Sequence, residues 1–295
     1  MINQAIRPVR KAVFPVAGMG TRFLPATKAV PKEMLPVVDK PVIQYAVEEA
    51  KAAGIEQFIF VTGRGKHIIE DHFDHAYELE ALLEARDKTS ELNSLLEALP
   101  PSGSVSFTRQ QSPLGLGHAV WCARHFVGDE PFAVLLPDEL LVDQPGCLEG
   151  MVTAYSEVGG NVIAVREVPQ EETKRYGIIT PDGDATGDLI AIRGIVEKPK
   201  PSEAPSRLAV IGRYILQPQV FAELERHERG AGDEIQLTDA LARLIGHGPF
   251  HAQRFHGQRF DCGDKVGFLQ ANIAIGLSRP DTAGPLREIL KQLKL

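Results

Sequence analysis

The stretch Val13–Pro41 constrains the fold most, because it joins a short apolar strand to a loop rich in glycine, proline and cations. We expect the strand over Val13–Ala17. The loop Gly18–Lys32 contains three positively charged residues and no acidic one, although the chain has a formal net charge of −7. Backbone N–H groups exposed beside glycine, together with Arg and Lys side chains, form sites for anions, most naturally phosphates. For the loop alone, a proline-rich surface turn with solvated cations explains the pattern equally well.

The segment after the loop completes a strand–helix–strand unit. Apolar residues recur at helical spacing over Pro41–Ala53, and Gly54 is suited to end that helix. Gln57–Val61 is a continuous apolar run with the length and β-branching of a buried parallel strand. A βαβ unit of this length predicts an α/β fold with a doubly wound sheet.

The rest of the chain predicts a mixed sheet in one domain. Further elements are expected as a helix over Ala119–Phe126 and as strands over Val105–Gln110, Phe132–Leu136, Val162–Val165, Ile178–Thr180, Ile190–Val196, Leu208–Ile215 and Phe250–Phe255. Turn-rich segments separate the later strands, which favours antiparallel pairing there and a smaller additional sheet. No repeat or long linker divides the 295 residues, so we expect a single domain over 1–295.

Two parts of the chain are predicted to be helical additions to this domain. Over about 76–103, leucines recur at helical spacing among charged residues, which indicates a helical hairpin inserted between strands. Over about 264–295, two amphipathic helices are expected, Asp264–Gly276 and Pro285–Leu295. The apolar faces of both additions suit packing on the body of the domain or on another subunit, and these alternatives stay open at this point.

Composition excludes several classes of partner. The acidic balance, with 39 Asp and Glu against 32 Lys and Arg, gives no electrostatic basis for nucleic acid as the main partner. No apolar run reaches the roughly 18–20 residues of a membrane span, and no apolar segment of a secretory signal precedes the first strand. Cys122, Cys147 and Cys262 are odd in number and form no CxxC pair. Their pattern favours a reducing cytoplasm and suggests neither a disulfide framework nor a zinc site.

Three polar features are interpreted as surface or structural ones. Gly63–Lys66 lacks the glycine spacing and the hydroxyl of a P-loop, so we expect a loop with solvated charges. His72 and His75 are three residues apart and are expected on one face of a helix. Two histidines do not complete a metal site, so we interpret this face as solvated polarity. Near the start of a later helix, Thr238 or Asp239 is placed as a cap, which is a structural role.

Several charged residues follow predicted strands, where ligands bind in open α/β sheets. Asp138 comes two residues after Phe132–Leu136 and is a candidate metal ligand, with a turn-forming Asp as the alternative. Glu197 and Lys198 end another strand. The lysine is suited to a phosphate and the glutamate to sugar hydroxyls, with an exposed ion pair as the alternative. Asp261 is a second lone acid beside a glycine.

Taken together, the motifs resemble those of the sugar nucleotidyltransferase family. The matching segments are Ala17–Pro25 (AGMGTRFLP), Pro31–Pro36 (PKEMLP), Pro113–Val120 (PLGLGHAV), Leu136–Asp138 (LPD), Tyr176–Gly177 (YG), Val196–Pro199 (VEKP), Gly212–Tyr214 (GRY), Glu234–Asp239 (EIQLTD) and Asp261–Gly263 (DCG). The similarity extends from about Val9 to Leu277 and is greatest to the bacterial UTP–glucose-1-phosphate uridylyltransferases, which also carry the helical insert. Phe14-Pro15-Val16 departs from the plainer aliphatic strand of many relatives, at positions away from the reacting groups.

The resemblance implies a fold, an activity and a set of ligands. The fold is a GT-A-like (Rossmann-like) nucleotidyltransferase fold with a mixed central sheet flanked by helices. The activity is transfer of the uridylyl group of UTP to glucose 1-phosphate, giving UDP-glucose and pyrophosphate with the help of Mg²⁺. The implied partners are these small molecules, with no nucleic acid and no membrane. The implied assembly is a cytoplasmic homo-oligomer, a dimer or a tetramer.

The resemblance also implies roles for individual residues. The nucleotide would be bound by Ala17, Gly18, Gly20, Gln110 and Gly115. The catalytic cations would be Arg22, Lys32 and Lys198, and the first two would bind the triphosphate. Glucose 1-phosphate would be held by Gly177, Glu197, Lys198 and Gly212. The magnesium ligands would be Asp138 and Asp261.

These residue types suit the reaction, because its nucleophile is a phosphate oxygen that is already ionised at neutral pH. The difficulty is electrostatic, since two unit charges 4 Å apart repel by about 4 kcal/mol at an effective dielectric of about 20. A divalent cation and basic side chains offset that repulsion. A dinucleotide-binding oxidoreductase is disfavoured, because Pro25 and Pro31 prevent the helix that follows its glycine loop. The alternatives are an enzyme that uses dTTP or another sugar 1-phosphate, and a catalytically silent regulatory homologue that binds sugar nucleotides.

Overall fold

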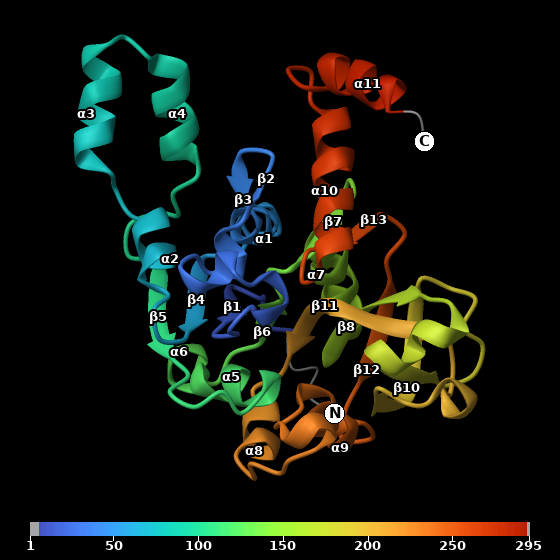
Figure 1. Ribbon diagram of the computed structural model, residues 1–295. Coiled ribbons are helices and arrows are strands. Elements are labelled where there is room, and N and C mark those ends of the chain that lie inside the picture. Colours follow the sequence, from blue (N-terminus) through green and yellow to red (C-terminus); the bar gives the residue numbers. More distant parts are fainter. Residues whose placement is uncertain (1–5, 294–295) are drawn as a thin grey trace.

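The computed structural model describes residues 6–293, and its centre is a nine-stranded sheet. The strands are ordered β5-β4-β1-β6-β11-β8-β12-β10-β9 across the sheet (Figure 1). Their bounds are β1 Lys11–Val16, β4 Gln57–Thr62, β5 Val105–Arg109, β6 Phe132–Leu135, β8 Asn161–Glu167, β9 Gly177–Pro181, β10 Leu189–Glu197, β11 Leu208–Leu216 and β12 Phe250–Arg254. The ends of the predicted domain 1–295 and of the predicted helix Pro285–Leu295 lie outside the described residues.

The two halves of the sheet differ in strand direction. β1 pairs in parallel with β4 and β6, and β4 pairs in parallel with β5, as the predicted βαβ unit requires. β11 is antiparallel to β6 and β8, and β10 is antiparallel to β12 and β9. The predicted mixed sheet is therefore confirmed. All nine residues of β11 are buried, because this central strand is covered on both faces.

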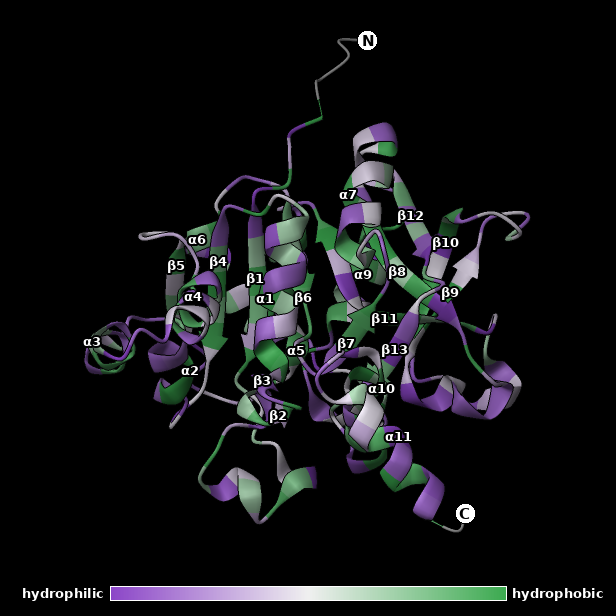
Figure 2. Cartoon of the chain, turned by 90° about the horizontal axis from the view of Figure 1, so that it is seen from above, coloured by the Kyte–Doolittle hydropathy of each residue, from purple (hydrophilic) through white to green (hydrophobic). Residues whose placement is uncertain are grey.

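Helices cover both faces of the sheet, and the sheet divides the core in two (Figure 2). One face packs on α5 (Leu116–Cys122), α8 (Val220–Leu224) and α9 (Leu237–Leu244). The other face packs on α1 (Val42–Ala52), α2 (His67–His72) and α7 (Cys147–Val158). Successive side chains of a strand point to opposite faces, so Val13 of β1 belongs to the first core and Phe14 to the second.

Two short ribbons lie beside the main sheet. β7 (Glu139–Val142) pairs antiparallel with β13 (Gln258–Asp261), and β2 (Pro36–Val37) pairs antiparallel with β3 (Lys40–Pro41). The β7–β13 ribbon provides the predicted smaller sheet. β7 itself was not predicted, because a four-residue strand directly after a turn has too little periodicity to be recognised.

The predicted helical hairpin is present as α3 (Tyr77–Ala85) and α4 (Thr89–Glu97). No residue of either helix is buried, and the two helices pack on each other and stand away from the body (Figure 1). At the other end of the chain, α10 (Lys265–Ser278) packs on β13 and β2, and α11 (Ala283–Gln292) packs on α10. The C-terminal helices thus cover the β7–β13 side of the molecule, whereas the hairpin covers none of the sheet.

The bounds of α2 correct one prediction about the histidines. α2 ends at His72, so His75 lies beyond the helix and does not share a face with His72. The ring of His72 is bonded to Gln44 and that of His75 to Glu80. These histidines therefore have separate protein partners.

The helix predicted over Ala119–Phe126 begins earlier, at Leu116, and is interrupted at Ala123 before α6 (Arg124–Val127). Short 3₁₀ helices complete the secondary structure: η1 Thr21–Phe23, η2 Ala26–Lys28, η3 Lys32–Met34, η4 Gln170–Arg175, η5 Pro201–Glu203 and η6 Ala231–Asp233. Within residues 6–293, none of the helices combines the length and the apolar character that a membrane span requires.

Candidate active site

A cleft of ≈ 570 Å³ opens along the carboxyl ends of the parallel strands. Its walls come from the segments after β1, β5, β6 and β10. The predicted site residues that line it are Ala17, Gly18, Arg22, Lys32, Gln110, Gly115, Asp138, Glu197 and Lys198. The residues after β1, β5 and β6 meet here because the carboxyl ends of parallel strands lie along one edge of the sheet. Glu197 and Lys198 reach the same cleft from the end of β10, in the antiparallel half of the sheet.

A second hollow of ≈ 450 Å³ continues the first. The predicted residues common to both hollows are Arg22, Asp138, Glu197 and Lys198. The second hollow adds Gly177, Gly212 and Asp261. Gly20 lines neither hollow; its φ is 65°, and its carbonyl accepts a hydrogen bond from Thr27 Oγ1 at 2.7 Å. A contact between Gly20 and a nucleotide therefore stays a prediction.

Lys32 and Asp138 form an ion pair inside the cleft. The loop after β1 carries Lys32 and the turn after β6 carries Asp138, and the distance from Lys32 Nζ to Asp138 Oδ2 is 2.6 Å. Burial alone would lower the pKa of Lys32 and raise that of Asp138. The opposite charge outweighs burial in both cases, so the pKa of Lys32 is raised and the pKa of Asp138 is lowered. Both side chains are therefore charged at neutral pH.

Asp261 brings a second carboxylate to the same space from the end of β13. A Cβ added to Gly263 would stand 3.0 Å from both Asp138 Oδ2 and Asp261 Oδ1, so these two oxygens face one small gap. The other oxygen of Asp261, Oδ2, lies 3.1 Å from Arg175 Nη2. Residues 6–293 contain no group of three or more His, Cys, Asp and Glu side chains placed to hold a metal ion. Two carboxylates fit Mg²⁺, which takes few protein ligands and completes its shell with phosphate oxygens and water.

A partly buried network that sequence reasoning missed fixes the position of these acids. In the β7–β13 ribbon, Asp261 is the register partner of Glu139, which follows Asp138 in the chain. Arg259 forms an ion pair with Glu139 and donates to Tyr176 Oη at 3.2 Å. Burial raises the pKa of Glu139, although Arg259 opposes this shift. The partners come from distant segments, so no local pattern could have revealed the network.

Glu197 and Lys198 form an ion pair with a nitrogen–oxygen distance of 2.9 Å at the end of β10. Glu197 also accepts a hydrogen bond from Thr238 Oγ1 at 2.7 Å. The N-cap of α9 is Gln236, so the predicted cap at Thr238 or the residue after it is wrong, and Thr238 lines the second hollow instead. A Cβ on Gly177 would stand 3.1 Å from Thr238 Oγ1 and 3.3 Å from Glu197 Oε2. Glycine therefore keeps this wall open.

The loop after β4 also differs from its prediction. Lys66 is buried, and its Nζ lies 2.7 Å from Glu33 Oε2, whereas a solvated charge was predicted at this position. Burial raises the pKa of Glu33, with Lys66 and Lys32 opposing the shift. A Cβ on Gly63 would stand 2.9 Å from the carbonyl oxygen of Ala17. The two loops therefore pack closely and hold the glycine loop after β1 in place.

Gln110 and Gly115 form the wall that the resemblance assigns to the base. Gln110 directly follows β5, and Gly115 directly precedes α5. Gly115 has a φ of 104°, and a Cβ there would come within 2.7 Å of Glu234 Cβ. Both the backbone conformation and the available space thus require glycine.

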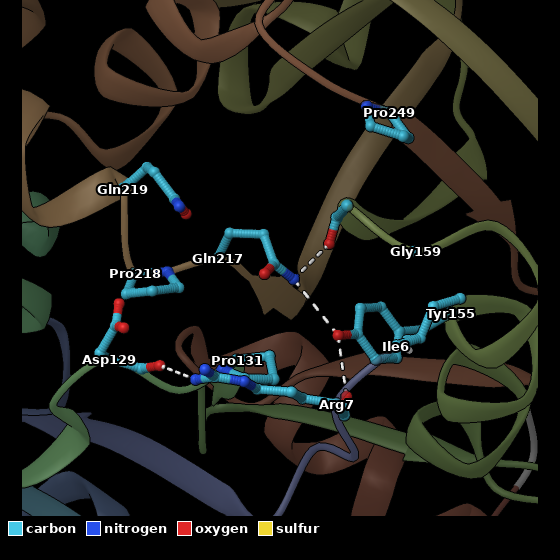
Figure 3. A pocket seen from close by; sticks show the side chains of 11 residues that line it. Ile6, Arg7, Asp129, Pro131, Tyr155, Gly159, Gln217, Pro218, Gln219 and Pro249 are labelled. Atoms are coloured by element: carbon cyan, nitrogen blue, oxygen red, sulfur yellow. Dashed lines mark hydrogen bonds between the residues drawn. The ribbon is translucent and has the colours of Figure 1, made fainter. Parts of the chain in front are cut away.

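A further cavity of ≈ 460 Å³ lies at the opposite edge of the sheet, beside the amino ends of the parallel strands (Figure 3). Its polar groups are bonded to one another. Gln217 Nε2 donates to the carbonyl of Gly160 at 2.7 Å, and Arg7 Nη1 donates to the carbonyl of Asp129 at 2.7 Å. Tyr155 Oη donates to the carbonyl of Arg7 at 3.0 Å. The charged groups that converge on the first two hollows make that cleft the candidate active site.

Known proteins share both the sequence and the fold. A family model described as nucleotidyl transferase matches residues 11–276. The UTP–glucose-1-phosphate uridylyltransferase of Komagataeibacter xylinus is 52% identical over 261 residues, which cover 88% of this chain and 92% of that protein. These similarities confirm the resemblance and the nucleotidyltransferase fold inferred from the motifs.

Two solved structures extend the agreement to three dimensions. A UTP-bound UGPase from Acinetobacter baumannii has 44% identity and a TM-score of 0.88, covering 97% of this chain and 100% of that chain. A UDP-glucose pyrophosphorylase complexed with UDP-glucose has 42% identity and a TM-score of 0.82, covering 92% of this chain and 100% of that chain. The chain therefore belongs to the nucleotidyl transferase family, in its branch of UTP–glucose-1-phosphate uridylyltransferases.

Proposed function

We propose that the chain, as a single nucleotidyltransferase domain, transfers the uridylyl group of UTP to glucose 1-phosphate and releases pyrophosphate. The observation that carries this proposal is a cleft of two adjoining hollows that share Arg22, Asp138 and Lys198. Transfer between two anionic substrates requires their phosphates to lie side by side, and the shared side chains stand where the hollows meet. Relatives described as UTP-bound and as complexed with UDP-glucose support the same ligands.

In this proposal, the first hollow takes UTP. The glycine loop after β1 offers backbone N–H groups to the triphosphate, and Arg22 and Lys32 neutralise its charge. Gln110 and Gly115 contact the uracil from the opposite wall. Lys66 pairs with Glu33 in the segment that follows β1. This contact fixes the glycine loop before the ligand binds, so the triphosphate side of the hollow is preorganised.

The second hollow takes glucose 1-phosphate. Lys198 has a side chain that is 45% exposed and pairs with Glu197, and it turns from Glu197 to the phosphate of the sugar. Glu197 accepts hydrogen bonds from sugar hydroxyls. Gly177 and Gly212 line this hollow beside the sugar ring. A Cβ on Gly212 would stand 2.9 Å from Glu139 Cγ, so no side chain fits at that position.

The chemistry follows from this placement. An oxygen of the sugar phosphate attacks the α-phosphorus of UTP and forms a new P–O bond. The bond from the α-phosphorus to the bridging oxygen breaks, and pyrophosphate leaves with that oxygen and its electron pair. No proton is transferred, so the site needs no general base. Positioning and charge neutralisation by Arg22, Lys32 and Lys198 supply the acceleration.

Mg²⁺ is the cofactor that we propose for Asp138 and Asp261. When bound, it acts as a Lewis acid that withdraws charge from phosphate oxygens. The two facing carboxylate oxygens fit such an ion. Lys32 pairs with Asp138 and Arg175 pairs with Asp261. If the two carboxylates bound Mg²⁺ instead, both cations would become available to phosphate oxygens.

A homo-oligomer, dimer or tetramer, and a cytoplasmic location complete the proposal. Val266, Leu269 and Ile273 of α10 are 65%, 60% and 43% exposed and recur at helical spacing. Such an apolar strip suits contact with a second copy of the chain. The location is supported by the buried free thiols Cys147 and Cys262, which a reducing compartment preserves, and by the supply of UTP in the cytoplasm.

Pyrophosphate release tests the function, measured for a matrix of nucleoside triphosphates and sugar 1-phosphates with and without Mg²⁺. We expect release with UTP, glucose 1-phosphate and Mg²⁺. A preference for dTTP or another sugar 1-phosphate would identify a related transferase, and no release in any combination would identify a silent sugar-nucleotide-binding homologue. Asp138→Asn is the matched variant, because it removes the charge with little change of shape. Turnover of this variant at ordinary Mg²⁺ concentrations would exclude Asp138 from the site.

A further inference from the structure

Two neighbours hold the side-chain amide of Gln110 in one orientation. Its Nε2 lies 3.0 Å from the carbonyl oxygen of Gly115 and 3.0 Å from Nδ1 of His118. A carbonyl oxygen only accepts hydrogen bonds, so the Gln110 atom beside Gly115 is the NH₂ group. One hydrogen of that group goes to Gly115 and the other to His118 Nδ1, which must therefore be an acceptor. The imidazole of His118 is then neutral, with its proton on Nε2.

The other atom of the amide, Gln110 Oε1, is open to the cleft. Gln110 lines the first hollow and is 8% exposed. Among residues 6–293, both hydrogen bonds of the Gln110 side chain go through Nε2, and Oε1 is not one of the buried side-chain atoms without a partner. A ligand in the hollow thus meets the acceptor Oε1 of Gln110, whereas the donor Nε2 of the same amide is already bonded to Gly115 and His118.

We propose that neutral His118 is a positioning residue that selects the base of the nucleotide by fixing the amide of Gln110. The exposed acceptor matches the N3–H donor of uracil and thymine. Cytosine has an acceptor at N3 and so offers no donor to Gln110 Oε1, and a site built to accept a hydrogen bond from its ligand rejects a ligand that lacks the donor. The inference rests on the proposed function, since it assigns the base selectivity of that same nucleotide site.

The surroundings of His118 favour the neutral imidazole. The ring stacks on Trp121 with centroids 5.7 Å apart and meets the ring of His227 at 5.6 Å. Cys122 Sγ lies 4.0 Å from both ring nitrogens. Burial, followed by the charges of His227 and Arg124, lowers the pKa of His118. The ring therefore accepts from Gln110 throughout the neutral range.

Protonation of His118 would reverse the arrangement. A protonated Nδ1 donates and can no longer accept from Gln110. Its charge-assisted hydrogen bond to Oε1 is stronger than the neutral bond from Nε2 to the Gly115 carbonyl, so the amide turns its Oε1 toward the imidazolium and gives up the bond to Gly115. Gln110 Nε2 then faces the base as a donor, which suits N3 of cytosine. Selectivity for uracil should therefore decline in acid.

The wild-type enzyme provides the first test, through the ratio of kcat/KM for UTP to kcat/KM for CTP. Both nucleotides carry the same triphosphate, so this ratio cancels the titration of the phosphates and of the groups that bind them. Cytosine N3 also takes up a proton in acid and then donates, so the wild-type profile is compared with that of His118→Asn, in which this residue does not titrate. We expect a constant ratio near neutral pH and, as His118 takes up a proton in acid, a fall roughly tenfold greater in the wild type than in His118→Asn. Equal acid profiles of the two proteins would overturn the proposal.

Two variants of His118 separate positioning from packing. His118→Asn keeps an acceptor near the position of Nδ1 but does not titrate, so we expect the neutral-pH ratio of the wild type and only the smaller fall in acid that protonation of cytosine causes. His118→Leu has comparable bulk but no acceptor, and we expect a ratio roughly tenfold lower at every pH. His227→Asn is the matched control; it contacts His118 but not Gln110, has a φ of 51° that Asn tolerates, and should keep the neutral-pH ratio.

A wild-type ratio in His118→Leu, or the full wild-type fall in acid in His118→Asn, would overturn the proposal. The comparison of the wild type with His118→Asn does not use the leucine variant, so the test survives if the leucine variant does not fold. Equilibrium binding of UTP and CTP, measured by calorimetry over the same pH range, reports selection without turnover. Absence of pyrophosphate release would therefore contradict the proposed function, whereas equal binding of UTP and CTP would contradict the role of His118.

Discussion

Asp261 on β13 stands opposite Glu139 on β7 in the antiparallel register of the small ribbon. Glu139 follows Asp138 in the chain, so backbone pairing sets the separation of the two carboxylates that we propose as metal ligands. A slip of one residue would turn Asp261 to the other face of the ribbon. Arg259 pairs with Glu139 across the same ribbon and secures the register. The separation of the two acids is thus set by the fold.

Lys198→Ala should impair the use of glucose 1-phosphate more than the use of UTP. A charge-assisted hydrogen bond to a phosphate contributes about 1.5–3 kcal/mol, so we expect the KM for glucose 1-phosphate to rise roughly 10- to 100-fold. Steady-state kinetics with each substrate varied in turn measures the difference. Lys200→Ala is the control, because Lys200 is 77% exposed and pairs with Glu203 instead. Equal losses for the two substrates would contradict the assignment.

The Lys32–Asp138 pair should contribute to stability in a defined pH window. The folded-state pKa of Asp138 is lowered and that of Lys32 is raised, so the contribution is present between about pH 4 and about pH 10. It is lost as the pH falls through the lowered pKa of Asp138 or rises through the raised pKa of Lys32. A double-mutant cycle with Lys32→Met and Asp138→Asn, measured by urea unfolding, should give a coupling of about 1 kcal/mol near pH 7. The same coupling at about pH 3 would show that this ion pair is not its source.

The parts of the site that could be predicted from sequence are those fixed by strand ends. Asp138 comes two residues after an apolar run that a buried strand explains, and Glu197 and Lys198 end another strand, so these positions indicated metal, sugar and phosphate contacts. The role of Gln110 and the identity of the two substrates came from the resemblance alone. Local patterns therefore identified residues but did not place them relative to one another.

The parts that could not be predicted depend on partners distant in sequence. The burial of Lys66 follows from its pairing with Glu33, and the role of Arg259 follows from its pairing with Glu139. A single lysine or arginine in a polar segment looks solvated until the chain brings a carboxylate to it. Thr238 was misassigned for the same reason, since Glu197 reaches it only in the folded chain.

Arg213→Met should destabilise the fold by about 3–5 kcal/mol, because it leaves the carboxylate of Glu49 without its buried partner. Arg213 is 1% exposed, and its Nη1 also donates to the carbonyl of Leu136 at 3.0 Å. The double variant with Glu49→Met should recover part of the loss, since it removes the unpaired charge. Urea unfolding measures both variants. A loss in the double variant as large as that in the single one would mean that the carbonyl contacts matter more than the charge.

Leu269→Glu should reduce the size of the proposed oligomer. Leu269 is 60% exposed in the apolar strip of α10, and a charge there opposes burial against a second copy. Light scattering coupled to size-exclusion chromatography measures the mass in solution. Ser156→Glu places the same charge at an exposed site on α7 and should leave the mass unchanged. A Leu269→Glu variant of unchanged mass would exclude α10 from the interface.

Gly263→Ala should weaken the response to Mg²⁺ without unfolding the protein. The added Cβ would stand 3.0 Å from the carboxylate oxygens of both Asp138 and Asp261, which is tighter than ordinary van der Waals contact. At least one carboxylate must move, and we expect the Mg²⁺ concentration for half-maximal turnover to rise roughly tenfold or more.

The control for this substitution is Gly248→Ala, because a Cβ at Gly248 meets no atom within 4 Å. Neither glycine has a φ in the left-handed region, so backbone strain is absent from both variants and the space around the new Cβ is the difference between them. Thermal unfolding without Mg²⁺ checks that both variants fold. An unchanged Mg²⁺ requirement in Gly263→Ala would mean that the gap between Asp138 and Asp261 is not where the metal binds, because a site formed by those two oxygens has no room for a methyl group.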